Sequence, residues 1–184
     1  MAFLAQGKRG KVYLKGNIAT KKSQPFRVIN EVYWLKILNK HKIGPKLIAY
    51  TKDSFSYNFV KGEEIITWAE KATKVNIIKV LKNIIKQCEV MDLLKVNKKE
   101  MNHPYKHILI SNNKPVMIDF ERCKITNNPK NVNQFFQFLI NSRMSSILKE
   151  KGIIINKKEI KELLKEYKKT RSKKVLNKLI SFFS

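Results

Sequence analysis

The spacing of apolar residues divides the chain into a strand-rich first third and a mostly helical remainder. Residues 2–22 hold three short apolar or alternating segments, "FLAQ", "KVYLK" and "IATKK", with Gly16-Asn17 at the second reversal. This pattern predicts an antiparallel meander. Two further segments, "KLIAY" and "SFSYNFV", predict two more strands before a turn at Lys61-Gly62.

Helical spacing of apolar residues first occurs between the third and fourth predicted strands. From Phe26 to Lys40 the apolar positions recur every three or four residues, and the pattern stops before Gly44-Pro45. The stripe of this predicted helix consists of Val28, Val32, Leu35 and Leu38, with Ile29 and Tyr33 beside them.

The longest regular pattern runs from Thr73 to Leu94 and predicts the core helix of a second lobe. A polar loop, "NKKEMNHPYKH", follows, and then a predicted hairpin of "ILI", an Asn112-Asn113 turn and "PVMIDF". Three amphipathic helices are predicted after residue 130, over 131–149, 156–169 and 173–183. The expected fold class is therefore α+β, with lobes at residues 1–62 and 63–184 forming one domain overall.

Composition narrows the class of protein. A hydrophobic content of 43% excludes a disordered chain, and no apolar run approaches the roughly 20 residues that span a bilayer. The first residues lack the features of a secretory signal, so we expect a cytoplasmic protein. Cys88 and Cys123 lack metal-ligand spacing, and we expect reduced, buried thiols with neither zinc nor a disulfide.

The charge balance is strongly basic. The chain has 39 Lys and Arg residues against 14 Asp and Glu, a formal net charge of +25. Such an excess attracts polyanions such as RNA, and it equally keeps a protein soluble. No RNP-like aromatic motif accompanies the charge, so binding of RNA or a ribonucleoprotein is left open.

Three short segments carry glycine or charged residues that could bind a ligand or form a buried ion pair. Gly7 and Gly10 bracket a hairpin whose backbone can lie close to a ligand, although an ordinary turn has the same form. Lys21 lies in the third predicted strand, and Glu31 lies on the apolar stripe of the first helix, where its carboxylate needs a cation. That cation is Lys21 or, in a surface pair, Arg27 one turn back.

The segment "VMIDFERCK" leaves a carboxylate, Asp119, at the end of a buried strand. Water, an arginine, a turn amide or a metal ion could each satisfy it. A hard cation such as Mg²⁺ prefers carboxylate oxygens, and the structural alternative is a cap on the following turn.

The order of these parts resembles the protein-kinase-like superfamily over residues 1 to about 125. "AQGKRGKV" matches the GxGxxGxV loop with Ala5 at the first glycine, and Ile18-Ala19-Thr20-Lys21 is similar to the V-A-I-K strand. More narrowly, "IGPKLIAY", "HPYKHILI" and "MIDFERC" resemble compact archaeal predicted serine/threonine kinases. Those are related to the RIO family and to the small kinase of the KEOPS tRNA-modification complex.

The resemblance implies a two-lobed kinase-like fold that binds ATP and Mg²⁺. In such a site Lys21 meets the nucleotide phosphates and is held by Glu31, while Asp119 takes the D-F-G aspartate position and holds Mg²⁺. The residues that it assigns to the nucleotide are Gly7, Gly10, Val12, Lys21, Glu31 and, at the adenine hinge, Phe59 and Val60.

Two positions depart from the family pattern. Glu121 replaces the D-F-G glycine, where it adds a metal ligand or pairs with a base such as Arg122. In the polar loop His107 takes the register of the metal-binding asparagine, and Asn102 falls at the catalytic aspartate. Glu100 becomes the candidate base if this loop is two residues longer. We expect His103, Lys106 and His107 to contact phosphate, or the two histidines to pack and hydrogen-bond within the loop.

These features together predict an ATP-dependent phosphotransferase of the atypical small serine/threonine protein kinase type. The γ-phosphoryl group would pass to a protein hydroxyl. The alternative is a catalytically weak or inactive kinase-like scaffold that binds RNA or a ribonucleoprotein. The basic charge, the altered loop and Glu121 favour this alternative.

Overall fold

A computed structural model describes residues 2–7 and 10–183 of the chain. The chain forms two compact units. The first contains Met1–Gly62 together with Val116–Cys123, and the second contains Glu63–Pro115 with Lys124–Ser184. A boundary after residue 62 was expected, but the return of Val116–Cys123 to the first unit was not.

A five-stranded antiparallel sheet forms the frame of the first unit, in the order β1-β2-β3-β5-β4. The first three strands are a meander, as the sequence predicted. The bounds are β1 (Ala2–Gly7), β2 (Gly10–Lys15), β3 (Ile18–Ser23), β4 (Leu47–Tyr50) and β5 (Ser54–Asn58).

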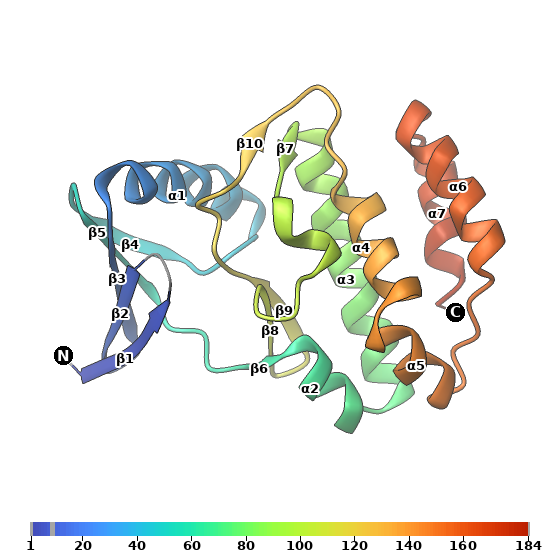
Figure 1. The fold of residues 1–184 in the computed structure, drawn as a ribbon, viewed down its shortest axis with the longest axis horizontal. Coiled ribbons are helices and arrows are strands. Elements are labelled where there is room, and N and C mark those ends of the chain that lie inside the picture. The colour runs from blue at the N-terminus through green and yellow to red at the C-terminus, as the bar shows by residue number, and fades with distance from the viewer. Residues whose placement is uncertain (1, 8–9, 184) are drawn as a thin grey trace. The chain divides into compact units, whose positions relative to one another are not determined.

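The helix α1 (Pro25–Leu38) packs against β3, β4 and β5 (Figure 1). It begins with proline at the first turn, where the missing N–H costs nothing, and passes into the 3-10 turn η1 (Asn39–His41). The predicted stripe from Val28 to Leu38 is buried. Ile29 and Tyr33 are exposed, so the apolar face is narrower than the sequence indicated.

The core of the second unit is built around α3 (Lys74–Leu93), which contacts α4 (Asn131–Asn141). Thr73 caps α3 by accepting a hydrogen bond from the Asn76 amide. The remaining helices are α2 (Ile65–Lys71), α5 (Arg143–Glu150), α6 (Lys157–Thr170) and α7 (Lys173–Ser181). The sequence predicted a core-facing stripe of Ile77, Leu81, Ile84, Cys88 and Met91, widened by Ile78 and Ile85. All of these residues are buried except Ile78, which is half-buried.

Short strands complete the second unit. β6 (Glu63–Glu64) pairs with β8 (Ile108–Ser111), and β7 (Val96–Asn97) pairs with β10 (Lys124–Ile125). The 3-10 turn η2 (Lys99–Asn102) follows β7. Between β8 and β9 (Lys114–Met117), Asn112 and Asn113 both adopt positive φ, as the predicted two-residue reversal requires.

Two predicted elements differ from the structure. The single helix expected over 131–149 is two helices, because Ser142 is extended and caps α5 while its hydroxyl donates to the Phe138 carbonyl. The strand expected over "PVMIDF" ends at Met117, two residues before Asp119. The helix α2 was not predicted.

The α+β class predicted from the sequence is confirmed: a five-stranded antiparallel sheet with one helix precedes a mixed, mostly helical region. Cys88 and Cys123 are both buried, as expected. Across residues 2–7 and 10–183, no helix combines the length and apolar character needed to cross a membrane.

Candidate functional site

Lys21 lies near the centre of the sheet in the first unit. It stands directly opposite Val12 on β2 and Phe55 on β5, so these three side chains share one face. Ala19, two residues earlier and on the same face, is 1% exposed. The Lys21 ammonium is therefore carried into a largely buried position, with 15% of the side chain exposed.

Glu31 on α1 is the nearest partner of Lys21. The distance from Lys21 Nζ to Glu31 Oε2 is 2.7 Å. The other carboxylate oxygen of Glu31 accepts a hydrogen bond of 3.2 Å from the Phe120 amide. Of the two partners predicted for Glu31, the structure therefore selects Lys21, and Glu31 links β3 to the segment Val116–Cys123.

That segment brings two further acids to Lys21. Asp119 Oδ1 lies 3.2 Å from Lys21 Nζ, and Glu121 Oε2 lies 3.7 Å from it. Glu121 Oε1 is also 3.3 Å from Arg27 Nη1. Of the two roles open for Glu121, pairing with bases is thus observed, and the bases include Arg27 and Lys21.

Asp119 adopts the left-handed backbone conformation, with φ of +63°. Aspartate and asparagine tolerate this region better than other residues that carry a side chain. The backbone turns at this residue as the chain leaves β9. Glu121, two residues later, is not among the described residues with positive φ.

One face of α1 holds the segment in place. Asn30 Nδ2 donates to the Glu121 carbonyl at 2.6 Å, and Trp34 Nε1 donates to the Cys123 carbonyl at 3.0 Å. Arg27, Asn30, Glu31 and Trp34 follow the i, i+3, i+4, i+7 spacing of one helix face. Asn30 and Trp34 have no role in the sequence analysis, although their spacing with Glu31 along one helix face is a signal for one.

Phe120 anchors the segment in the core. It is fully buried, and a Cβ atom placed on Gly44 would lie 2.8 Å from Phe120 Cε2 and 3.1 Å from Leu35 Cδ2. Gly44 also has φ of +80°. Glycine is therefore required at this position both by its backbone conformation and by the close approach of Phe120.

Burial and neighbouring charges shift the pKa values of Lys21, Glu31 and Tyr57. Burial alone would lower the pKa of Lys21, but the nearby carboxylates of Glu31, Asp119 and Glu121 outweigh it and raise the pKa above its usual range. Burial raises the pKa of Glu31, and the Lys21 ammonium opposes that rise. Burial and then the charge of Glu31 raise the pKa of Tyr57, on the adjacent strand, to about 12.

The three acids could also hold a cation. Glu31, Asp119 and Glu121 each offer an oxygen within 4.8 Å of the others, and they form a potential metal-binding group within the described part of the chain. Three carboxylates against the two bases Lys21 and Arg27 leave a formal excess of one negative charge. The Asp119 side chain is 37% exposed, against 5% for Glu31 and 2% for Glu121, so Asp119 is the acid best able to reach a solvent-borne ion.

The predicted glycine loop is partly described. Gly7 and Gly10 face each other across the β1–β2 hairpin, while Lys8 and Arg9 at its tip lie outside the described residues. A Cβ atom on Gly10 would lie 2.5 Å from the Lys22 carbonyl oxygen, so strand packing alone requires glycine there. Phe59 and Val60 follow the end of β5, and the Phe59 amide donates to the Asn17 carbonyl.

The other predicted site residues belong to the second unit. Glu100 lies in η2, and its Oε2 atom is 3.6 Å from Nζ of Lys98, whose side chain is fully buried. The Lys98 amide donates to Asn131 Oδ1. His107 is half-buried, and its amide donates to the Pro104 carbonyl. A buried lysine beside Glu100 was not anticipated, because nothing in "NKKE" distinguishes Lys98 from its neighbours.

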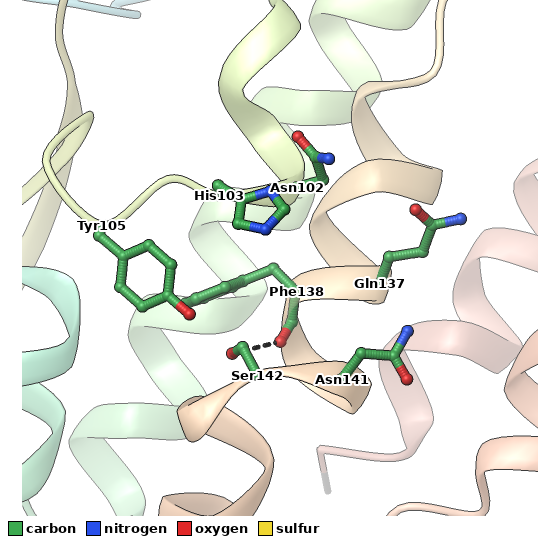
Figure 2. Close-up of a pocket in the computed structure, with 7 residues that line it drawn as sticks. All are labelled: Asn102, His103, Tyr105, Gln137, Phe138, Asn141 and Ser142. Atoms are coloured by element: carbon green, nitrogen blue, oxygen red, sulfur yellow. Dashed lines mark hydrogen bonds between the residues drawn. The ribbon is translucent and has the colours of Figure 1, made fainter.

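A small pocket of about 180 Å³ adjoins this loop (Figure 2). Tyr105 packs edge-on against Phe138, with ring centroids 5.5 Å apart. The lining is mostly polar and consists of Asn102, His103, Tyr105, Gln137, Phe138, Asn141 and Ser142. A pocket with these amides and hydroxyls can accept a small hydrogen-bonding group.

A buried polar network joins the helices of the second unit. Asp92 Oδ1 accepts hydrogen bonds from both nitrogens of Asn131, and Asp92 Oδ2 lies 3.0 Å from Arg171 Nη1. Arg171 also donates to the Pro129 carbonyl. Burial raises the pKa of Asp92, and its hydrogen bonds and Arg171 oppose that rise. This network ties the junction of α6 and α7 to α3.

Comparison with known proteins gives one informative relationship. The chain is 32% identical over 114 residues to "Uncharacterized protein MJ1211" of Methanocaldococcus jannaschii, covering 60% of this chain and 97% of that protein. The chain belongs to the same family as this archaeal protein. No family model matches the chain. The name of the MJ1211 relative states no activity, so a function must be argued from the site itself.

Proposed function

We propose that the chain is an ATP-dependent phosphotransferase of the small atypical serine/threonine protein kinase type, with a kinase-like fold. The observation that carries the proposal is the position of Lys21 within 2.7 Å of Glu31 and 3.2 Å of Asp119. A strand lysine, a helix glutamate and the aspartate of a D-F-G-like segment are the three charged groups that phosphoryl transfer from ATP uses in protein kinases.

Phosphoryl transfer from ATP requires the protein mainly to position the reactants and to neutralise their charge. Phosphoryl transfer breaks the bond between the γ-phosphorus and the bridging oxygen of ATP and forms a bond to the acceptor oxygen, releasing ADP. In this proposal Lys21 neutralises the nucleotide phosphates while Glu31 fixes the direction of its ammonium. Gly7, Gly10 and Val12 form the strand hairpin assigned to the phosphates, and Phe59 and Val60 are assigned to the adenine.

The carboxylate set fits a hard divalent cation. Mg²⁺, when bound with ATP, supplies charge neutralisation at the phosphates, and Asp119 is its assigned ligand because its carboxylate is the most exposed of the three. The cluster carries a formal excess of one negative charge. A triphosphate alone is therefore repelled, and nucleotide binding should depend strongly on the divalent cation.

Glu100 is the assigned general base, which accepts the proton of the acceptor hydroxyl. Its Oε2 atom lies 3.6 Å from the buried ammonium of Lys98, which favours the ionised carboxylate that a base needs. His107 keeps its assignment as a second metal-binding residue, from its register in the loop. The pocket lined by Asn102, His103 and Tyr105 is the place in the second unit where we assign the acceptor side chain.

Thermal unfolding with nucleotide tests the proposal. Mg²⁺-ATP at about 100 times its Kd should raise Tm by about 5–10 °C, and ATP with EDTA should not. Asp119→Asn should abolish the shift while keeping the left-handed backbone, because asparagine tolerates positive φ. Glu162→Gln, an exposed change on α6, is the matched control and should keep the shift. A wild-type protein that Mg²⁺-ATP does not stabilise would overturn the proposal.

A further inference from the structure

One sector of α6 carries all of its lysines. Four of them, Lys157, Lys161, Lys165 and Lys168, recur at i, i+4, i+8 and i+11, and all four are exposed. At about 3.6 residues per turn and 1.5 Å per residue they form a row about 16 Å long within a sector of about 80° of the helix surface. We call these four residues the lysine row. Lys158 and Lys169 extend the same sector along one side.

The other residues of α6 keep to separate faces. The acids Glu159, Glu162 and Glu166 are exposed and follow the i, i+3, i+7 spacing of a strip of their own. The apolar residues Ile160, Leu164 and Tyr167 are buried and form the third face. A helix that used lysine only for solubility would mix its charges, whereas here they are sorted by sign.

Folding does not need this arrangement. Lysines four residues apart repel each other along a helix, and Lys157 in the first turn opposes the helix dipole, whereas Lys168 in the last turn favours it. The helix is instead held by its buried face and by contacts with α4 and α7 (Figure 1). Asn156 also caps the Lys158 and Glu159 amides. A bound polyanion would attract all four lysines and so offset the repulsion among them.

We propose that the lysine row binds the sugar-phosphate backbone of a double-stranded nucleic acid. The net charge of +25 attracts polyanions, and backbone phosphates spaced about 3.4 Å along each strand place several charges beside a rigid 16 Å row. This inference does not depend on the phosphotransferase proposal, because it rests on a different element and on charge alone.

Two observations favour a duplex over other polyanions. The exposed residues of α6 and α7, all of them within the described part of the chain, include no aromatic side chain on which the bases of a single strand could stack. The apolar residues of both helices are buried, as Leu164 and Leu176 are, or half-buried, as Leu163 and Ile180 are, and none is fully exposed. They cannot enter a bilayer as those of an interfacial helix do.

Two variants of the full chain test the row. The row variant replaces Lys157, Lys161, Lys165 and Lys168 by glutamine. The control variant replaces Lys15, Lys40, Lys46 and Lys52, which are exposed residues of the first unit, in the same way. Each variant removes four positive charges. Glutamine preserves helix propensity, so the row variant should keep its circular dichroism, and its Tm should equal or exceed that of the wild type.

The measurement is the salt dependence of binding to a fluorescent DNA duplex of about 20 base pairs, by anisotropy. In the row variant the slope of log K against log salt should become shallower by about 3 relative to the wild type. In the control variant it should change by less than about 1. Equal changes in the two variants would show that only net charge matters, and the proposal would be wrong.

Three further binding experiments identify the polyanion. An RNA duplex of the same sequence shows whether the proposed surface serves RNA, DNA or both, and loss of either interaction in the row variant supports the proposal. A single strand of equal length that binds as tightly as the duplex would overturn it. The proposal would also be wrong if the row variant no longer bound phosphatidylserine vesicles but still bound the duplex.

Discussion

The Lys21 ammonium lies 2.7 Å from the carboxylate of Glu31, whose second oxygen accepts a hydrogen bond from the Phe120 amide. One buried glutamate therefore joins the central strand, the helix α1 and the segment that carries Asp119. The geometry of the candidate site depends on this residue more than on any other.

Glu31→Gln tests that dependence. The variant keeps the size of the side chain but removes the negative charge nearest Lys21, so a buried ammonium loses its closest partner. We expect the free energy of unfolding to fall by about 1–3 kcal/mol, measured by urea denaturation. Glu162→Gln on the exposed face of α6 is the control and should change stability by less than about 0.5 kcal/mol. Equal stability of Glu31→Gln and the wild type would contradict the assigned role.

Gly44→Ala tests the packing of Phe120. The new Cβ atom meets the Phe120 ring at 2.8 Å and also requires alanine at φ of +80°. Gly16→Ala is the matched control, since Gly16 has φ of +56° but nothing within 4 Å of a new Cβ atom. We expect a loss of about 2–4 kcal/mol for Gly44→Ala and about 1 kcal/mol for Gly16→Ala. Equal losses would mean that the Phe120 contact is not tight.

Arg171→Asn tests the buried network of the second unit through its pH dependence. Asparagine suits the left-handed backbone of residue 171 but removes the cation beside Asp92. Burial raises the pKa of Asp92, and loss of Arg171 should raise it further. The folded state then binds a proton at Asp92 more tightly than the unfolded state, so the cost of burying the ionised carboxylate is largest at high pH.

The free energy of unfolding of Arg171→Asn should therefore be measured as a function of pH. We expect Arg171→Asn to lose about 3 kcal/mol of stability near pH 7.5, and the loss should shrink as the pH falls toward 4, where Asp92 becomes protonated. Arg171→Lys keeps the charge and should show a weaker pH dependence. A loss for Arg171→Asn that stays constant from pH 4 to pH 7.5 would contradict the buried pair.

The two thiols should be inert in the folded protein. Burial, and then the charge of Asp92, raise the pKa of the Cys88 thiol, and Cys123 is only 4% exposed. Because the thiolate is the reactive form, neither residue should react with a disulfide reagent at pH 8 within minutes. Both should react in guanidinium chloride. Rapid labelling of either thiol without denaturant would show that its unit opens readily.

The first unit was largely predictable from sequence because its signals are local. Alternating apolar positions gave the meander, and helical spacing placed Glu31 on the buried side of α1. A buried carboxylate at Glu31 needs a cation, which left Lys21 and Arg27 as candidates, and the structure selects Lys21. The resemblance to kinases pointed to Asp119, although the expected boundary at residue 62 placed this residue in the second lobe.

The parts that sequence reasoning missed depend on contacts between distant residues. Glu121 meets Arg27 across 94 positions, and Asp92 meets Arg171 across 79, so neither pair has a signature within one helix or strand. Lys98 is the same residue type as its exposed neighbour Lys99, yet its side chain is fully buried. The break at Ser142 was missed because serine occurs within helices as well as at their caps.

Single-turnover transfer of labelled γ-phosphate from Mg²⁺-ATP is the most direct measurement of whether Lys21 and Asp119 serve one triphosphate. The wild type should transfer the label to a protein hydroxyl, Glu162→Gln should match it, and Lys21→Met and Asp119→Asn should each reduce the rate at least about 100-fold. Glu100→Gln should lower the rate without weakening nucleotide binding. Transfer by Asp119→Asn at the wild-type rate, or no transfer by the wild type, would contradict the proposed function.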